Sequence, residues 1–297
     1  MQCYKYYGMI SVIISSADAA RLQKVTENIT ATIDVPFEII AIDNSKGQRG
    51  ICAVYNEGGR AAKFDILCFM HEDVIIETSG WGRSLSDIFK NDSKIGLVGV
   101  AGAAYKSLTP SPWSGYGIDT RQINLIQSYK YKNSDPELLY RNPDNSQLAD
   151  VACIDGVFMC TTKNVFLAHQ FDEDTFKNFH LYDVDLSINI GRQYKVVVTF
   201  DILLDHLSEG RYDKTWLQDN LKLHEKWNNY LPINIAGLDL KQQQFVEKIT
   251  FKALTRQLKE FDMPASLAYK VLWQKRFRKL YFALFLKLNY YLLKSRA

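Results

Sequence analysis

The chain of 297 residues is long enough for one large α/β domain with a smaller appendage, or for two ordinary domains. Its composition, 47% hydrophobic and 23% charged, is typical of soluble globular proteins, so a sizeable core is expected. No apolar run in the sequence reaches the length that a membrane-spanning helix needs. The formal net charge of +3 is unevenly spread, because residues 235–297 hold 13 Lys and Arg against 4 Asp and Glu while acids outnumber bases elsewhere. This asymmetry predicts that the C-terminal region meets an anionic surface.

The first third of the chain alternates predicted strands with predicted helices. Apolar, β-branched runs predict strands at residues 9–15, 37–43 and 65–71. Apolar residues at helical spacing predict helices at residues 21–33 and 51–63. This alternation is typical of βαβ units, so we expect an α/β fold with a largely parallel sheet.

The middle of the chain is less regular. A fourth strand is predicted at residues 95–102, and residues 105–150 follow as a Pro-, Ser- and Asn-rich stretch that predicts a functional loop or lid. Strand character returns at residues 151–161, a helix is predicted at 183–193 and a further strand at 194–204.

The number and positions of the five cysteines indicate whether the protein resides in a reducing or an oxidising compartment. Their number is odd, they form no CxxC pair, and four of them stand in apolar stretches where cysteine behaves as a small hydrophobe. The N-terminus also lacks the features of a signal peptide. We therefore expect a reduced, cytoplasmic protein. The cysteines are Cys3, Cys52, Cys68, Cys153 and Cys160.

Polar residues follow the first two predicted strands. Ser15 and Asp18 come at the end of the first, and Asp43 and Asn44 at the end of the second. Ligands of parallel α/β sheets bind beyond the carboxyl ends of the strands. These side chains are therefore expected at one crevice.

The third strand ends in His71, Glu72 and Asp73, and the last predicted strand ends in Asp205 and His206. Two metal-binding side chains one residue apart can point to the same side, so His71 and Asp73 predict a divalent-metal site that neutralises a pyrophosphate. The alternative is a solvated acidic loop. His206 is either a further metal ligand or a structural histidine.

Asp183 and Asp185 stand at the start of a predicted helix. One of them is a candidate general base near the crevice. The alternative is that both carboxylates simply favour the positive end of the helix dipole.

Several nucleotide-binding and hydrolytic motifs are absent from the sequence. It contains no GxxxxGK[ST] loop, no GxGxxG after the first strand and no GxSxG elbow. A P-loop NTPase, a dinucleotide-dependent enzyme and an α/β-hydrolase are thus unsupported.

The order of these motifs resembles family 2 glycosyltransferases of the GT-A fold, particularly the glycosyltransferase-like branch with a histidine in place of the first acid of the metal motif. The segments that carry the resemblance are ISVIIS with Asp18, IIAIDNSKG, YNEG, DILCFMHEDV, Trp81, CIDGVFMCTTKNVF, FHLYDVDLSINIGRQYKVVV and DHLSEG. The resemblance implies a Rossmann-like, mostly parallel GT-A sheet flanked by helices, with a C-terminal basic helical extension.

By this resemblance, Asp183 is the catalytic base and the metal ligands are His71, Asp73 and His206. The implied nucleotide-sugar contacts are Ser15, Asp18, Asp43, Asn44, Asn56, Glu72 and Asp73. The implied acceptor-side residues are Trp81, Asp155, Gly156 and Asp185. Two positions depart from the family pattern: His71 replaces a carboxylate, and Tyr182 replaces the usual Glu before the base.

The implied reaction is an inverting transfer, assisted by Mn²⁺ or Mg²⁺, from a nucleoside-diphosphate sugar, with a UDP-sugar favoured. The acceptor is the hydroxyl of a glycan or a lipid-linked saccharide, in polysaccharide biosynthesis. A nucleotidyltransferase would need a basic, glycine-rich loop after the first strand, which residues 15–21 do not supply. The remaining alternative is a non-catalytic protein that binds nucleotide sugars or glycans on a degenerate GT-A scaffold.

The sequence divides into a predicted glycosyltransferase domain, residues 1–234, and a basic helical region, residues 235–297. Residues 268–294 interleave basic side chains with aromatic ones and contain no acid, which suits an interfacial helix on an anionic membrane. We therefore expect a peripheral location on the inner face of the cell membrane; the alternatives are packing on the catalytic domain, on a second subunit or on another protein. No nucleic-acid-binding module accompanies the basic region. The aromatic residues are Trp273, Phe277, Tyr281, Phe282 and Phe285.

Overall fold

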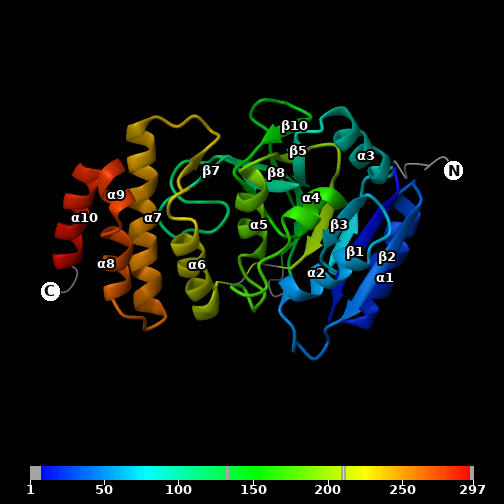
Figure 1. The fold of residues 1–297 in the computed structure, drawn as a ribbon, viewed down its shortest axis with the longest axis horizontal. Coiled ribbons are helices and arrows are strands. Elements are labelled where there is room, and N and C mark those ends of the chain that lie inside the picture. Colours follow the sequence, from blue (N-terminus) through cyan, green and yellow to red (C-terminus); the bar gives the residue numbers. More distant parts are fainter. Residues whose placement is uncertain (1–7, 131–133, 209, 211, 295–297) are drawn as a thin grey trace. The chain divides into compact units, whose positions relative to one another are not determined.

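The computed structural model describes residues 8–130, 134–208, 210 and 212–294 (Figure 1). Cys3 and Arg296 lie outside the described residues. The chain forms two compact units: residues 1–102 with 121–211, and residues 103–120 with 212–297. The predicted boundary between the glycosyltransferase domain and the basic helical region, at residues 234/235, stays a prediction.

The first unit is built on a seven-stranded sheet. Five of its strands, β2, β1, β3, β5 and β13, run in the same direction, and β12 and β10 run opposite to them. The predicted mostly parallel α/β sheet is confirmed. The strand order is β10 (Leu148–Asp150), β13 (Lys195–Thr199), β5 (Ile95–Gly99), β12 (Phe158–Thr162), β3 (Ile66–Met70), β1 (Ile10–Ser16) and β2 (Phe37–Asp43).

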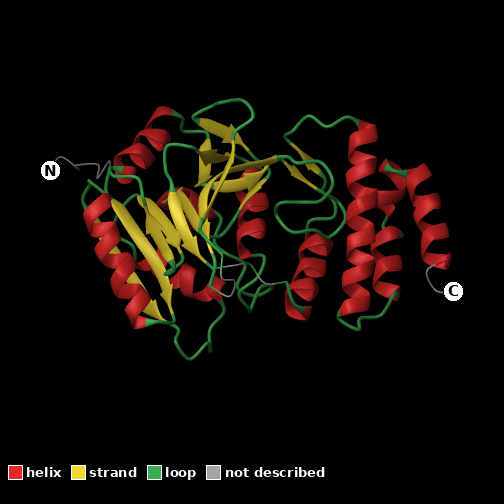
Figure 2. Cartoon of the chain, turned by 180° about the vertical axis from the view of Figure 1, so that it is seen from behind, coloured by secondary structure: helices red, strands yellow, loops and turns green. Residues whose placement is uncertain are grey.

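Helices flank this sheet, as Figure 2 shows in red beside the yellow strands. They are α1 (Ala19–Thr32), α2 (Ile51–Ala61), α3 (Trp81–Asn91), α4 (Lys163–Ala168) and α5 (Tyr182–Gly191). In α1, Val25 and Ile29 are buried at helical spacing, as the sequence pattern predicts. Helix α2 packs close to β1, because a Cβ on Gly58 would lie 2.4 Å from the side chain of Ile13.

A second sheet of the first unit contains strands that the sequence did not predict. Its order is β11 (Cys153–Ile154), β6 (Ala101–Ala103), β8 (Arg121–Ser128), β14 (Leu204–Leu207) and β4 (Val74–Ile76), and β9 (Glu137–Arg141) pairs with β8. The prediction of an irregular loop over residues 105–150 is therefore wrong. These strands are short, and β8 pairs with a partner about 80 residues away in sequence, a relation that local pattern does not report.

Two predicted strands are each divided in the structure. Residues 151–161 break at Asp155 and Gly156 into β11 and β12, and residues 194–204 break after Thr199 into β13 and β14. The two halves belong to different sheets. The first break places Asp155 and Gly156 between the sheets, and the second carries the chain to β14, which holds His206; the candidate site uses both features.

The second unit is mainly helical. It contains α6 (Lys214–Lys226), α7 (Leu240–Glu260), α8 (Ser266–Leu272), α9 (Lys275–Leu280) and α10 (Phe282–Lys294), and β7 (Tyr105–Lys106) pairs with β15 (Ile233–Asn234). The predicted C-terminal helical extension is confirmed. None of the helices that the structure describes is long and apolar enough to cross a membrane.

Buried polar groups hold the segment 103–120 within the second unit. The carboxylate of Glu247, fully buried on α7, accepts hydrogen bonds from the backbone N–H groups of Leu108 (2.7 Å) and Thr109 (2.9 Å). The ammonium group of Lys106, also fully buried, donates to the carbonyl oxygen of Ser111 at 2.6 Å. Burial raises the pKa of Glu247, with the hydrogen bonds acting against that shift.

Candidate functional site

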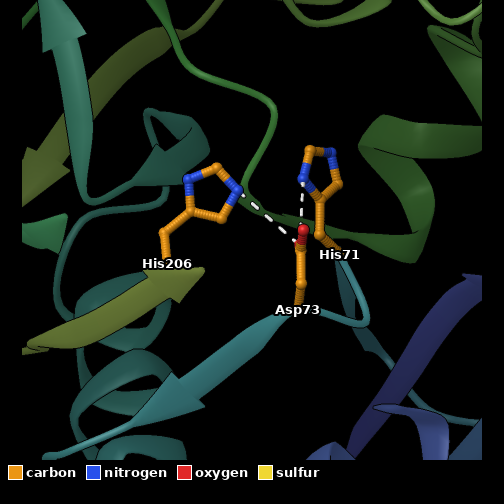
Figure 3. A group of neighbouring side chains, drawn as sticks. All are labelled: His71, Asp73 and His206. Carbon is orange, nitrogen blue, oxygen red and sulfur yellow. Dashed lines mark ion pairs between the residues drawn. The ribbon is translucent and has the colours of Figure 1, made fainter. Parts of the chain in front are cut away.

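His71, Asp73 and His206, here called the metal triad, meet at the edge between the two sheets (Figure 3). His71 and Asp73 lie in the turn that joins β3 to β4. Strand β14 pairs antiparallel with β4, with His206 opposite Val74, so the histidine comes to lie beside Asp73. The prediction that these three residues gather is supported by this geometry.

The spacing of the metal triad suits a divalent cation. Oδ1 of Asp73 lies 3.6 Å from Nε2 of His206 and 3.9 Å from Nδ1 of His71, too far for direct hydrogen bonds. One ligand atom from each residue lies within 4.8 Å of the other two. Nε2 of His206 is buried and has no hydrogen-bond partner among the described residues, a state that a metal ion would relieve. The residues therefore fit a metal ion.

Tyr182 fixes the orientation of His71. Its hydroxyl lies 2.7 Å from Nε2 of His71 and donates to the carbonyl oxygen of Gly156 at 3.4 Å. A hydroxyl that donates to the carbonyl must accept from Nε2–H, which leaves the Nδ1 lone pair of His71 facing Asp73. Burial, followed by the charge of His206, lowers the pKa of His71 and favours the neutral ligand form.

We expect Tyr182→Phe to weaken Mn²⁺ binding by about 10- to 100-fold, because the ring stays in place while the hydroxyl that orients His71 is lost. Isothermal titration of the protein with Mn²⁺ alone measures this effect. Tyr194→Phe, which removes a hydroxyl just beyond the other end of α5, is the control and should bind Mn²⁺ as the parent does. Equal affinity in the two variants would contradict the role of Tyr182.

Two residues in the first turn of α5 bind the backbone of Gly156, one at its N–H and one at its carbonyl oxygen. Oδ2 of Asp183 accepts a hydrogen bond from the N–H of Gly156 at 3.0 Å, while Tyr182 donates to its carbonyl. Leu181, buried before this turn, has a φ of +63°, an uncommon conformation for leucine that starts α5 abruptly. The metal triad and Asp183 are thereby joined through one short turn.

Glycine is required at position 156. An added Cβ would lie 2.2 Å from the hydroxyl oxygen of Tyr182 and 2.6 Å from its ring. We expect Gly156→Ala to lower the free energy of unfolding by about 1–3 kcal/mol, because Tyr182 must move from a packed position. Urea unfolding measures this change. Gly191→Ala, at the other end of α5, is the control, since its Cβ would make only an ordinary 3.5 Å contact.

Asp183 has the electrostatics of a general base. Burial, and then the negative charge of Asp155, raises its pKa to about 7. Backbone N–H groups of Val184 and Gly156 bind its two oxygens and oppose the shift. A carboxylate with a pKa near neutrality can accept a proton from a hydroxyl and release it again.

The ends of β1 and β2, the two strands that follow β3 in the sheet, supply further polar groups. Asp18 caps α1, accepting from the N–H of Ala20 at 2.9 Å, and Glu72 accepts from the N–H of Asp18 at 3.2 Å. Asp43 accepts from Ser45, and Asn44 binds the backbone of Arg49. Together with Ser15, opposite Ile42 in the sheet, these residues line adjacent strand ends as predicted. Their contact with a nucleotide stays a prediction.

Three other predicted site residues lie in the interior. The amide of Asn56 is buried and binds the backbone of Phe171 on both sides. Trp81 is fully buried, with its indole N–H donating to Thr32 at 3.1 Å, and Asp185 is buried in α5. The contacts of Asn56 and Trp81 indicate structural roles, and nucleotide or acceptor contact by Asn56, Trp81 and Asp185 stays a prediction.

Two residues that the sequence did not single out belong to the site. Nη1 of Arg21, in the first turn of α1, lies 3.9 Å from Oδ2 of Asp73, so a cation stands beside the metal triad. Phe179, whose ring centroid is 5.4 Å from that of His71, is 54% exposed. A basic residue after the first strand and an aromatic residue before Tyr182 were the available signals, but neither is distinctive without the fold.

The fold is that of the GT-A glycosyltransferases. The crystal structure of GalNAc-T7 with UDP, GalNAc and Mn²⁺ matches 86% of this chain with a TM-score of 0.50 and 10% identity. This chain spans 58% of the length of that protein. A197 from STIV matches 68% of this chain and 86% of its own, with a TM-score of 0.39 and 13% identity. No curated protein matches the sequence.

The model of a family described as glycosyltransferase-like matches residues 9–233. The chain belongs to this glycosyltransferase-like family, whose members are related to family 2. Both the family and the fold of this chain are thus of the glycosyltransferase type.

Proposed function

We propose that this protein is an inverting, metal-assisted glycosyltransferase that moves a sugar from a nucleoside-diphosphate sugar to an acceptor hydroxyl. The observation that carries the proposal is the link through Gly156, which holds the candidate base Asp183 and the metal-orienting Tyr182 in one turn. The pKa of Asp183 is raised by burial and by the charge of Asp155, and its position one turn from the metal triad favours a catalytic role over binding alone.

In the proposed reaction, the oxygen of the acceptor hydroxyl forms a bond to the anomeric carbon as the bond to the nucleoside diphosphate breaks. The hydroxyl proton passes to Asp183, and the electron pair of the broken bond leaves with the diphosphate. Single displacement at one face of the sugar inverts the anomeric configuration. Arg21, beside Asp73, is placed to attract the leaving diphosphate.

We propose Mn²⁺ rather than Mg²⁺ as the ion of the metal triad. Two of the three ligands are imidazoles, which suit transition-metal ions, whereas Mg²⁺ prefers oxygen ligands. When bound, such an ion would neutralise charge that develops on the leaving diphosphate. The neutral form of His71 that burial favours is the form that binds a metal.

We propose a UDP-sugar as the donor and a glycan or lipid-linked saccharide as the acceptor, in polysaccharide biosynthesis. GalNAc-T7, which shares the fold, was crystallised with UDP, GalNAc and Mn²⁺. The proposed location is cytoplasmic and peripheral on the inner face of the cell membrane, where lipid-linked acceptors are found.

Thermal unfolding in the presence of UDP, GDP or CMP, each with and without Mn²⁺, tests the proposal. A ligand at a hundredfold its Kd stabilises the folded state by about 2.7 kcal/mol. We expect stabilisation by one nucleoside diphosphate that depends on Mn²⁺. Stabilisation without turnover across a panel of sugars and acceptors would favour the non-catalytic alternative. No stabilisation by any nucleotide would contradict the proposed transferase and favour a degenerate scaffold.

The pH dependence follows from Asp183. A base must be deprotonated to act, and the pKa of Asp183 is raised to about 7, so kcat/KM should rise with pH and reach half its maximum near pH 7. Below that midpoint the rate should fall about tenfold per pH unit. Asp155→Asn removes the neighbouring negative charge and should move the midpoint to lower pH. A flat profile between about pH 5 and about pH 8 would argue against Asp183 as the base.

A further inference from the structure

Helix α10 presents an apolar stripe on its outward face. The stripe, called the outer stripe here, consists of Phe282, Leu286, Tyr290 and Leu293, which recur at the spacing of one helix face. Their exposed fractions are 62%, 53%, 60% and 64%. Four large apolar side chains in a row on one exposed face mark a surface that contacts something else.

The opposite face of α10 packs against other helices of the second unit. Leu284, Phe285, Leu288 and Leu292 are buried, and the helix packs against α7, α8 and α9 within the second unit (Figure 1). Three of the aromatic residues that the sequence pattern assigned to a membrane, Phe277, Tyr281 and Phe285, are buried in this packing. That part of the sequence prediction is wrong, and the outer stripe takes its place.

Exposed lysines lie on α10, which carries the outer stripe, and on the preceding helix α9. Lys279, Lys287 and Lys294 are exposed, and the structure describes no ion pair for any of them. Nζ of Lys294 lies 4.9 Å from the ring centroid of Tyr290, so its aliphatic stem follows the stripe while its charge remains at the surface. The sequence contains no acidic residue after Asp262. Helix α10 and the helices α8 and α9 before it therefore contribute apolar and basic side chains and no acidic one.

The combination of apolar and basic side chains indicates which partner binds to this surface of α10. A second copy of the chain would bring two sets of lysines together with no carboxylate from this region to balance them, whereas an anionic lipid surface attracts the lysines and accepts the apolar stripe. The 13 residues of α10 span about 20 Å, too short to cross the hydrocarbon core, so the helix would lie in the plane of the interface.

We propose that the outer stripe of α10, with Lys279, Lys287 and Lys294, is an interfacial anchor for an anionic membrane. The side chains of Phe282 and Leu286 enter the boundary between headgroups and acyl chains, and the lysines contact lipid phosphates. Trp273, 54% exposed and hydrogen-bonded to Asn289 of α10 at 2.9 Å, adds an aromatic residue to the same helical group. The anchor acts through lipid binding alone, so its success or failure is separate from that of the proposed sugar transfer.

Co-sedimentation of the full chain with vesicles tests the anchor. We expect binding to phosphatidylglycerol-rich vesicles and little binding to pure phosphatidylcholine. Phe282→Ser combined with Leu286→Ser should lower the partition coefficient about tenfold or more, because the buried apolar area is lost. Leu138→Ser is the matched control, since Leu138 is 59% exposed on β9 and far from α10 in sequence.

The charge contribution is tested separately. Lys279→Gln and Lys287→Gln should each lower binding about fivefold at low salt, and Lys90→Gln on α3 should not change it. All of these positions are exposed, and the melting temperature of each variant verifies that the fold is intact.

Three outcomes would overturn the proposal. The first is equal binding to both kinds of vesicle, and the second is loss of binding in the Leu138 control as large as in the stripe variant. The third is absence of vesicle binding together with a dimer in gel filtration that Phe282→Ser dissociates, which would assign the stripe to a second copy of the chain.

Discussion

Asp183→Asn is expected to lower kcat by about 10²- to 10⁴-fold, the range that a positioned general base contributes. Asparagine has nearly the same shape and can still accept a hydrogen bond from Gly156, but it cannot take the proton of the acceptor hydroxyl. Asp183 is not a member of the metal triad, so affinity for UDP and Mn²⁺ should be unchanged. Single-turnover kinetics together with nucleotide titration separate the two effects.

Asp174→Asn is the control for this experiment. Asp174 is exposed and nine residues before Asp183, so its loss should leave kcat and nucleotide affinity as they are. If Asp183→Asn retained full turnover, the base would have to be sought elsewhere, and Asp155, beside it, would be the first residue to test.

Asp73→Asn is expected to weaken Mn²⁺ binding by more than about 100-fold, beyond the range for residues that only orient a ligand. Oδ1 of Asp73 faces both histidines and Oδ2 faces Arg21, so one substitution removes the negative charge from the centre of the group. Because donor binding is proposed to depend on the metal, affinity for UDP in the presence of Mn²⁺ should fall as well.

Electron paramagnetic resonance of free Mn²⁺ measures this affinity directly and without turnover. Asp87→Asn, an exposed substitution on α3, serves as the control. Unchanged Mn²⁺ binding in Asp73→Asn would show that the metal triad is not a metal site, and it would return His206 to the structural role that the sequence left open.

The sequence predicted best where a structural element is defined by its own residues. The strand at 37–43 agrees with the observed Phe37–Asp43, because a run of Ile and Phe between polar residues is a local property. The strand end at His71 and Asp73 was likewise visible, since a buried strand must be followed by polar residues at its exposed edge. Local pattern therefore placed two of the three residues of the metal triad.

Prediction failed where long-range pairing decides the structure. Arg121–Ser128 forms β8 through pairs with β9 and β14, and the polar residues in this segment hid it from a search for apolar runs. Asn56 and Trp81 are residues of types that often occur in binding sites. Both are buried against residues distant in sequence, which a local pattern does not reveal. Residue type alone did not distinguish these roles.

The two residues that depart from the family pattern, Tyr182 and His71, are in contact with each other, which accounts for both departures together. Tyr182 stands where Glu is usual, and His71 stands where a carboxylate is usual. The hydroxyl of Tyr182 contacts the imidazole of His71 at 2.7 Å, so the tyrosine orients a histidine that a carboxylate ligand would not need. Considered singly in the sequence each change weakened the assignment, whereas the contact between them supports it.

The membership of residues 103–120 in the second unit has a consequence for synthesis of the chain on the ribosome. Residues up to 211 can complete the first unit as soon as they emerge, but Lys106, Leu108 and Thr109 belong to a unit whose partner Glu247 is made later. At about 5–20 residues per second, synthesis from residue 211 to residue 247 takes roughly 2–7 seconds. Until Glu247 is made, we expect residues 103–120 to extend from the folded first unit as a hydrated loop. Their polar groups become buried only when the C-terminal part of the chain folds.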